Sequence, residues 1–112
     1  MPRPHKPLSP TSVATLKAVA DGIRHGFDIM DATGLPSGTV YPVLARLEKA
    51  GLIRSRWEAA AIARREKRPP RRYYEITAPG TRELALSLEH YRTLASRRGS
   101  HRAAVDPVPR KL

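Results

Sequence analysis

The segment LPSGTVYPVLARLEKAGLI, residues 35–53, constrains the fold more than any other part of the chain. Its apolar residues recur at the spacing of one helix face, and small, polar and basic residues occupy the opposite face. Gly51 is typical of the position just after a helix ends. We therefore expect a helix over residues 38–50 with one face packed on a core and the other face free. The expected inward residues are Val40, Val43, Leu44 and Leu47, and the expected outward residues are Thr39, Pro42, Arg46 and Lys49.

The residues before this helix predict how it begins. Pro36 disfavours helical backbone at the residue that precedes it, and Ser37 is expected to accept hydrogen bonds from amides of the first turn. Ser37 and Gly38 would then lie at a helix start, where free backbone amides favour the binding of a phosphate.

Helical spacing of apolar residues predicts three more helices. One begins near residue 9 or 12, and a short one covers about residues 26–33, with His25 expected to cap it. The last helix covers about residues 79–98. Its apolar residues form one stripe, which consists of Leu84, Leu88, Tyr91, Leu94 and Ala95.

Two segments after the quoted helix alternate like half-buried strands, at residues 52–58 and 72–77. Trp57 and the tyrosines of the second strand are expected to pack in a core or a dimer interface. Between the strands, residues 59–70 form a long insert whose alanine-rich half suits a helix. The basic side chains of this insert and of the residues that follow it are Arg64, Arg65, Lys67, Arg68, Arg71 and Arg72.

The charge of the chain indicates a polyanionic partner. Lys and Arg number 21 against 10 Asp and Glu, for a net charge of +11. Residues 54–77 alone hold eight basic and three acidic residues, a net of +5. An excess of this kind favours nucleic acid or an acidic membrane surface as the partner.

Other features of the composition exclude whole classes of protein. The chain has no cysteine, which excludes a disulfide framework and thiolate metal sites and suits a cytoplasmic location. No apolar run approaches the ~20 residues of a membrane span, and the basic N-terminus is not followed by the apolar region of a signal peptide. We therefore expect no membrane partner.

The order helix, helix, helix, strand, basic insert, strand, helix predicts a winged helix-turn-helix fold, mostly α with a small β-hairpin wing. A major groove about 12 Å wide admits one helix with small, polar and basic groups outward. In this interpretation residues 9–78 form a DNA-binding domain, with the wing at 52–77, and residues 79–98 form a C-terminal dimerisation helix. The proline-rich basic ends, 1–8 and 99–112, are expected to be a flexible arm and a flexible tail.

Three stretches carry a family resemblance: HGFDI at 25–29, GTVYPVLARLEKAGLI at 38–53 and RRYYEIT at 71–77. Together they closely resemble the PadR family of transcriptional regulators, over about residues 12–95. The resemblance implies a cytoplasmic winged-helix dimer that usually represses transcription and in several members responds to a small effector molecule. It also implies dimerisation through the C-terminal helix. Tyr41 resembles a family position near the DNA phosphates, although its ring equally suits the core.

This sequence departs from the family pattern in two places. The turn that usually reads Ser-Pro-Gly-Thr is Pro-Ser-Gly-Thr here, at residues 36–39, which shifts the expected cap by one residue. The wing insert at 59–70 is longer and more basic than the resemblance implies, and suits either further DNA contact or a disordered loop.

The leading hypothesis is a homodimeric repressor that binds double-stranded DNA at an inverted repeat and is released by a small effector. The alternative is a non-specific nucleic-acid-binding basic protein. The expected DNA contacts are Ser37, Gly38, Thr39, Tyr41, Pro42, Arg46, Lys49, Arg64, Arg65, Lys67, Arg68, Arg71 and Arg72, and the expected dimer contacts are Leu84, Leu88, Tyr91, Leu94 and Ala95.

Catalysis is not expected. The sequence offers no nucleophile paired with a base and no glycine-rich phosphate loop. His25, Asp28 and Asp31 lie close in sequence, but capping explains His25 better than metal binding does. We therefore expect no catalytic residue, no metal site and no cofactor.

Overall fold

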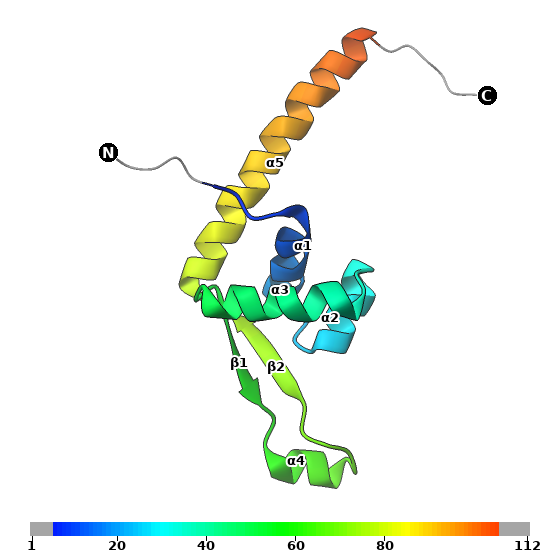
Figure 1. Cartoon of the computed structure of the whole chain (residues 1–112), viewed down its shortest axis with the longest axis vertical. Helices are drawn as coiled ribbons and strands as arrows, with labels where there is room; N and C mark the ends of the chain where they lie inside the picture. The colour runs from blue at the N-terminus through cyan, green and yellow to red at the C-terminus, as the bar shows by residue number, and fades with distance from the viewer. Residues whose placement is uncertain (1–5, 106–112) are drawn as a thin grey trace, which may run out of the picture.

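Over residues 6–105, the part of the chain that this computed structural model describes, four helices lie around the base of a two-stranded hairpin, and a fifth lies at its far end (Figure 1). The predicted fold class, mostly α with a β-hairpin wing, is confirmed. The elements are α1 (Pro10–Ala20), α2 (Gly26–Thr33), α3 (Ser37–Lys49), β1 (Ile53–Trp57), α4 (Ala60–Arg65), β2 (Arg72–Ile76) and α5 (Ala78–Val105).

The core lies where α1, α2 and α3 meet, and α5 and the hairpin close it. Leu16 of α1 and Ile29 of α2 are fully buried. The four residues expected on the inward face of α3 are all buried: Val40, Val43, Leu44 and Leu47. Because this face is fixed against the core, the rotation of α3 about its own axis is fixed as well.

The start of α3 differs from the expectation by one residue. Pro36 occupies the N-cap position and Ser37 is the first helical residue, so the expected cap by Ser37 is wrong. A proline has no side-chain acceptor for the first-turn amides, and no side-chain cap hydrogen bond forms there. His25 occupies the N-cap position of α2, as expected, but its side chain makes no cap hydrogen bond, and its Nδ1 lies 3.2 Å from the carbonyl oxygen of Arg72.

The hairpin is antiparallel, with Ile53 opposite Ile76 at its base and Trp57 opposite Arg72 at its outer end. On one face, Ile53 and Tyr74 are buried in the core. The expectation that Trp57 packs in the core is wrong, because 64% of this residue is exposed. The hairpin leaves the helical body after its first few residues, and α4 lies at its far end (Figure 1).

Thr77 joins the hairpin to α5. Its Oγ1 accepts from the amide of Gly80 at 3.1 Å and donates to the carbonyl oxygen of Gly51 at 2.7 Å. Gly80 lies so close to the residues after α3 that a methyl group on it would sit 2.0 Å from the carbonyl oxygen of Leu52. The first turn of α5 is therefore locked to the base of the wing.

Helix α5 continues past its expected end near residue 98 to Val105, so residues 99–105 of the expected tail are helical. At the other end, Leu8 of the expected arm is tied to α5. Its amide donates to Ser87 Oγ at 3.0 Å, and the Tyr91 hydroxyl donates to its carbonyl oxygen at 2.7 Å. Residues 1–5 and 106–112 lie outside the described residues. None of the described helices is both long enough and apolar enough to cross a membrane.

Candidate nucleic-acid interface

The outward face of α3 is open, as expected. Pro42, Arg46 and Lys49 are exposed, and Thr39 is half-buried. Arg46 and Lys49 form no ion pair with any acidic side chain that the structure describes. This face therefore presents two free cations and a hydroxyl on the opposite side from the core.

The expected wing cations divide into two groups. Arg68 and Arg72 are each paired with a glutamate inside the chain. The others make no ion pair with a described acidic residue, and all of them are exposed: Arg64, Arg65, Lys67 and Arg71. Sequence position alone does not separate these groups, because the pairing partners, Glu58 and Glu48, are distant in the sequence.

Arg68 closes the wing insert by a two-pronged ion pair with Glu58. Its Nη1 and Nη2 lie 2.5 Å and 2.9 Å from the two carboxylate oxygens, and the amide of Arg71 donates to the same carboxylate at 3.3 Å. The hydrogen bond from Arg68 lowers the pKa of Glu58 from 4.5 to about 2. The insert is thus folded and clamped, and not an open loop.

Helix α4 ends in a conformation that is unusual for its residue. Lys67 has a positive φ of 56°, a region that glycine usually occupies. Its amide donates to the carbonyl of Arg64, and the next amide, of Arg68, donates to Ala63. This cap turns the chain back toward β2 and leaves the Lys67 side chain exposed at the tip of the wing.

Arg72 ties the wing to α3. Its Nη2 lies 3.3 Å from Glu48 on α3, and its Nε and Nη2 donate to Ser55 Oγ, which itself donates to Glu48 at 2.7 Å. The guanidinium also lies over the ring of Trp57, 5.7 Å from its centre. The face of the wing that adjoins α3 is therefore organised around Arg72.

The opposite face of the wing holds a second ion-pair group that the sequence analysis did not single out. Arg54 and Arg56 both approach Glu75, at 3.4 Å and 3.1 Å. Partial burial raises the pKa of Glu75, but the two arginines outweigh it and lower that pKa overall. These cations are partly neutralised, so this face is the weaker candidate for binding an anion.

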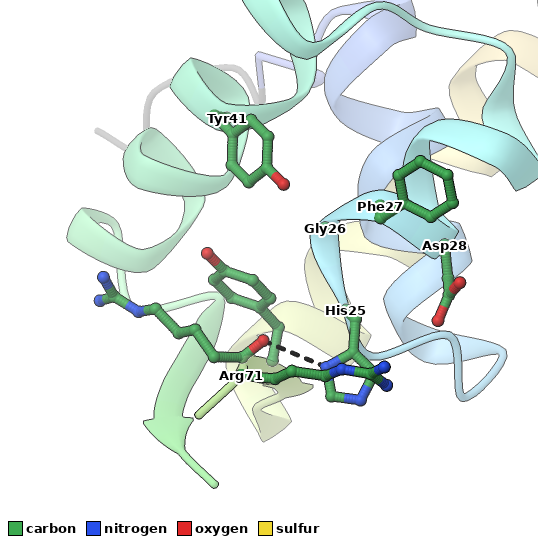
Figure 2. Close-up of a pocket in the computed structure, with 8 residues that line it drawn as sticks. His25, Gly26, Phe27, Asp28, Tyr41 and Arg71 are labelled. Atoms are coloured by element: carbon green, nitrogen blue, oxygen red, sulfur yellow. Dashed lines mark hydrogen bonds between the residues drawn. The ribbon is translucent and has the colours of Figure 1, made fainter. Parts of the chain in front are cut away.

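A cleft of about 350 Å³ opens between the start of α2, α3 and β2 (Figure 2). Tyr41 points into it from α3, and Arg71 borders it from the wing (Figure 2). Tyr41 packs so closely on Gly26 that a methyl group there would lie 2.5 Å from the tyrosine hydroxyl. Tyr41 is 47% exposed, which removes the alternative of a core position for its ring. The cleft has a cationic edge, because Arg71 and Arg72 line it.

The acidic and histidine residues of the described part of the chain form no group of three or more that is suited to a metal ion. His25 and Asp28 both line the cleft, but His25 is turned toward the carbonyl oxygen of Arg72. The outward face of α3, the wing and the cleft together form a basic surface, which suits an anionic polymer as its partner.

The family model of the transcriptional regulator PadR-like family matches residues 15–86. The chain belongs to this family. PadR-like proteins are transcriptional regulators and not enzymes, so the expectation that the chain is not an enzyme is confirmed at the family level. DNA-binding regulation of transcription is the function that this membership assigns.

Several solved structures share the fold, and PadR-like regulators are among them. A PadR-like transcription factor from Bacteroides fragilis is 21% identical, with 80% of this chain and 86% of that chain covered and a TM-score of 0.65. A PadR family regulator from Clostridium difficile R20291 is 19% identical, with 83% and 98% covered and a TM-score of 0.67. BpsR of Bordetella bronchiseptica is 22% identical, with 94% and 73% covered and a TM-score of 0.61. No match to a curated protein was found.

The PadR-like match ends at residue 86, so most of the expected dimer stripe on α5 lies beyond it. Leu84 is 7% exposed and packs in the core of its own chain, and Tyr91 is half-buried against Leu8. Leu88 and Leu94 are 39% and 38% exposed, and Ala95 is exposed as well. Packing within the chain accounts for the first two residues and leaves the last three available to a partner.

Proposed function

We propose that this PadR-like chain is a sequence-specific repressor that binds an inverted-repeat operator in double-stranded DNA as a homodimer. The observation that carries the proposal is the outward face of α3, where Arg46 and Lys49 are exposed and make no ion pair with a described residue, opposite a fully packed face. A helix held in this way can enter a major groove with its basic side chains toward the base edges.

The residues of α3 take separate roles in this proposal. Arg46 and Lys49 contact guanine edges or nearby phosphates, and Thr39 contacts a thymine methyl group or a phosphate. Ser37 and Gly38 begin the helix, so their amides face the DNA backbone. Tyr41 reaches a phosphate at the cleft beside α2.

The wing contributes backbone contacts that do not depend on sequence. Arg68 and Arg72 would have to leave Glu58 and Glu48 to bind a phosphate, so we assign them mainly to holding the wing in shape. The better backbone contacts are the four exposed cations that have no ion pair within residues 6–105: Arg64, Arg65, Lys67 and Arg71.

A second copy of the chain is expected along α5. Leu88 and Leu94 expose apolar surface there, and a chain of this size gains from burying it. Two-fold symmetry would place the two α3 helices in successive major grooves, with half-sites about 10 bp apart.

Release by a small effector is part of the proposal. The DNA binding of BpsR, a protein of the same fold, is regulated by 6-hydroxynicotinic acid. An effector of this chain would bind near the dimer interface and prefer one spacing of the α3 helices over the other, since only differential affinity shifts an equilibrium. The expected cytoplasmic location stays a prediction, and no cofactor is proposed.

The first test is selection of binding sites from a random duplex pool at near-physiological salt, with the full chain. We expect an inverted repeat whose half-sites lie about one helical turn apart. In vitro transcription from a promoter that carries the selected site should then fall as protein is added. An increase in transcript would mean that the protein activates transcription and does not repress it, while the proposed DNA site would still stand.

The alternative, a non-specific nucleic-acid-binding protein, draws on the net charge of +11 and the unpaired wing cations. It predicts binding with a steep salt dependence and no preferred sequence. Failure of the selection to yield a motif, with binding that vanishes as salt rises, would favour this alternative over the repressor.

A further inference from the structure

Packing in the core does not account for Trp57. It is the only tryptophan of the chain, and it is 64% exposed at the outer end of β1. Single exposed apolar residues are ordinary on protein surfaces, so the exposure alone assigns no role. The position and the surroundings of the ring are what distinguish it.

The ring continues the face of the wing that adjoins α3. Side chains alternate along a strand, so Trp57 shares a face with Ser55, which donates to Glu48 of α3. Arg72 lies directly across the hairpin from Trp57 and also pairs with Glu48. Trp57 is therefore the next residue on this face of β1 after Ser55, through which the wing contacts α3.

The charge around the ring selects among partners. The Arg72 guanidinium lies over the indole, 5.7 Å from its centre. Arg71 and the cations of α4 stand exposed and without an ion pair among the described residues. Two copies of this surface would repel each other, whereas a polyanion with apolar patches between its charges would fit. Duplex DNA has that pattern, because deoxyriboses lie between successive phosphates.

We infer that Trp57 is a DNA-contacting residue, whose ring packs on the deoxyriboses along the minor groove that flanks each half-site. The Arg72 guanidinium packs on one face of the ring and fixes its position, and the neighbouring wing cations bind the phosphates on either side. The contact adds apolar surface to an interface that is otherwise electrostatic. Apolar side chains recur in minor-groove proteins, where they are often inserted between base steps; here the ring would pack on the sugars instead. The inference rests on the proposed DNA binding and names a wing residue outside the expected contacts.

The single tryptophan allows a direct test, because all indole fluorescence of the wild-type chain comes from Trp57. The full chain is titrated with the duplex obtained by site selection, and acrylamide quenching is measured at each point. The free protein should emit as an exposed indole with ready quenching. Quenching should fall as duplex is added and level off when the protein is saturated.

Two variants test whether the contact contributes to affinity. Trp57→Ala should weaken duplex binding about tenfold, as expected for losing one buried aromatic contact, and Trp57→Phe should keep most of the affinity. Because the ring is exposed, the melting temperature should move by less than about 4 °C. Leu86→Ala removes an apolar side chain that is 51% exposed on α5, away from the wing, and should bind like the wild type.

Three outcomes would overturn the inference. One is unchanged quenching at saturating duplex, together with normal affinity of Trp57→Ala. Another is an indole that is already protected in free protein in a concentration-dependent way, which would place Trp57 between two copies of the chain. The third is equal loss of affinity in Leu86→Ala. If the wild type binds no duplex at all, both the proposed function and the inference about Trp57 fail. That result is distinct from the three outcomes above, which overturn the inference alone.

Discussion

At the scale of single residues, Arg46 is the side chain that we expect to contribute most to recognition of the DNA sequence. It is exposed on α3 and unpaired among the described residues. Arg46→Ala is expected to cost ~1–3 kcal/mol of operator binding and to relax the preference at one base position. Fluorescence anisotropy on operator and random duplexes measures both effects. Lys17→Ala, at an exposed residue of α1, serves as the control. An equal loss on both duplexes would mean that Arg46 contacts only the backbone.

Lys67 allows a charge to be removed without a cost in folding. Its φ of 56° is strained for lysine and unstrained for glycine. Lys67→Gly should therefore leave the free energy of unfolding unchanged or raise it by up to about 1 kcal/mol. If Lys67 meets a phosphate, the same variant should bind all duplexes more weakly and lower the salt slope by about one ion. Denaturant unfolding and binding at several salt concentrations test the two halves separately.

At the scale of elements, the wing insert depends on the ion pair between Glu58 and Arg68. The pKa of Glu58 is lowered to about 2 in the folded wing, against an ordinary value of 4.5. A lowered carboxyl pKa stabilises the fold above the ordinary value, and this contribution is lost as the pH falls from 4.5 toward 2. Glu58→Gln should lower the hydrogen-exchange protection of the insert amides at pH 6, and the difference from wild type should shrink as the pH approaches 2. A difference that is independent of pH would assign Glu58 a packing role only.

The contact between α5 and the wing base gives a second prediction at this scale. A methyl group on Gly80 would lie 2.0 Å from the carbonyl oxygen of Leu52, and neither backbone can move without disturbing the hairpin. Gly80→Ala should therefore destabilise the chain by about 3 kcal/mol or more. Gly38→Ala is the matched control, because nothing lies within 4 Å of the added methyl group and alanine favours a helix. Thermal unfolding followed by circular dichroism measures both, and equal melting temperatures would contradict the steric argument.

Much of the fold follows from the sequence because its signals are local. Periodicity predicts the inward face of α3, and alternation predicts both strands of the hairpin. The errors have physical causes. Alternation identifies the face on which Trp57 lies but not how far the core extends along the strand. The partners of Arg68 and Arg72 lie ten and 24 residues away in sequence, so no spacing rule separates these cations from their unpaired neighbours. The expected end of α5 near residue 98 is too early, because the helix passes through Gly99 and ends at Val105.

At the scale of the whole molecule, α5 and the wing extend from opposite sides of the helical body (Figure 1). A dimer built along α5 would thus leave both wings and both α3 helices free for DNA. Leu88 and Leu94 are the exposed leucines of the expected stripe, whereas Leu84 is part of the chain's own core.

We therefore expect the double variant Leu88→Glu, Leu94→Glu to remain folded and to become monomeric, because these side chains are about two-fifths exposed in the single chain. Loss of the second copy should weaken operator binding far more than binding to a single half-site, since the paired half-sites are read only by a dimer. Sedimentation velocity measures the assembly state. The ratio of the affinities for a full operator and for a single half-site measures how much the second copy contributes to binding. Leu86→Glu, exposed off the stripe, should stay dimeric. A double variant that still dimerises and binds the operator normally would move the interface away from this stretch of α5.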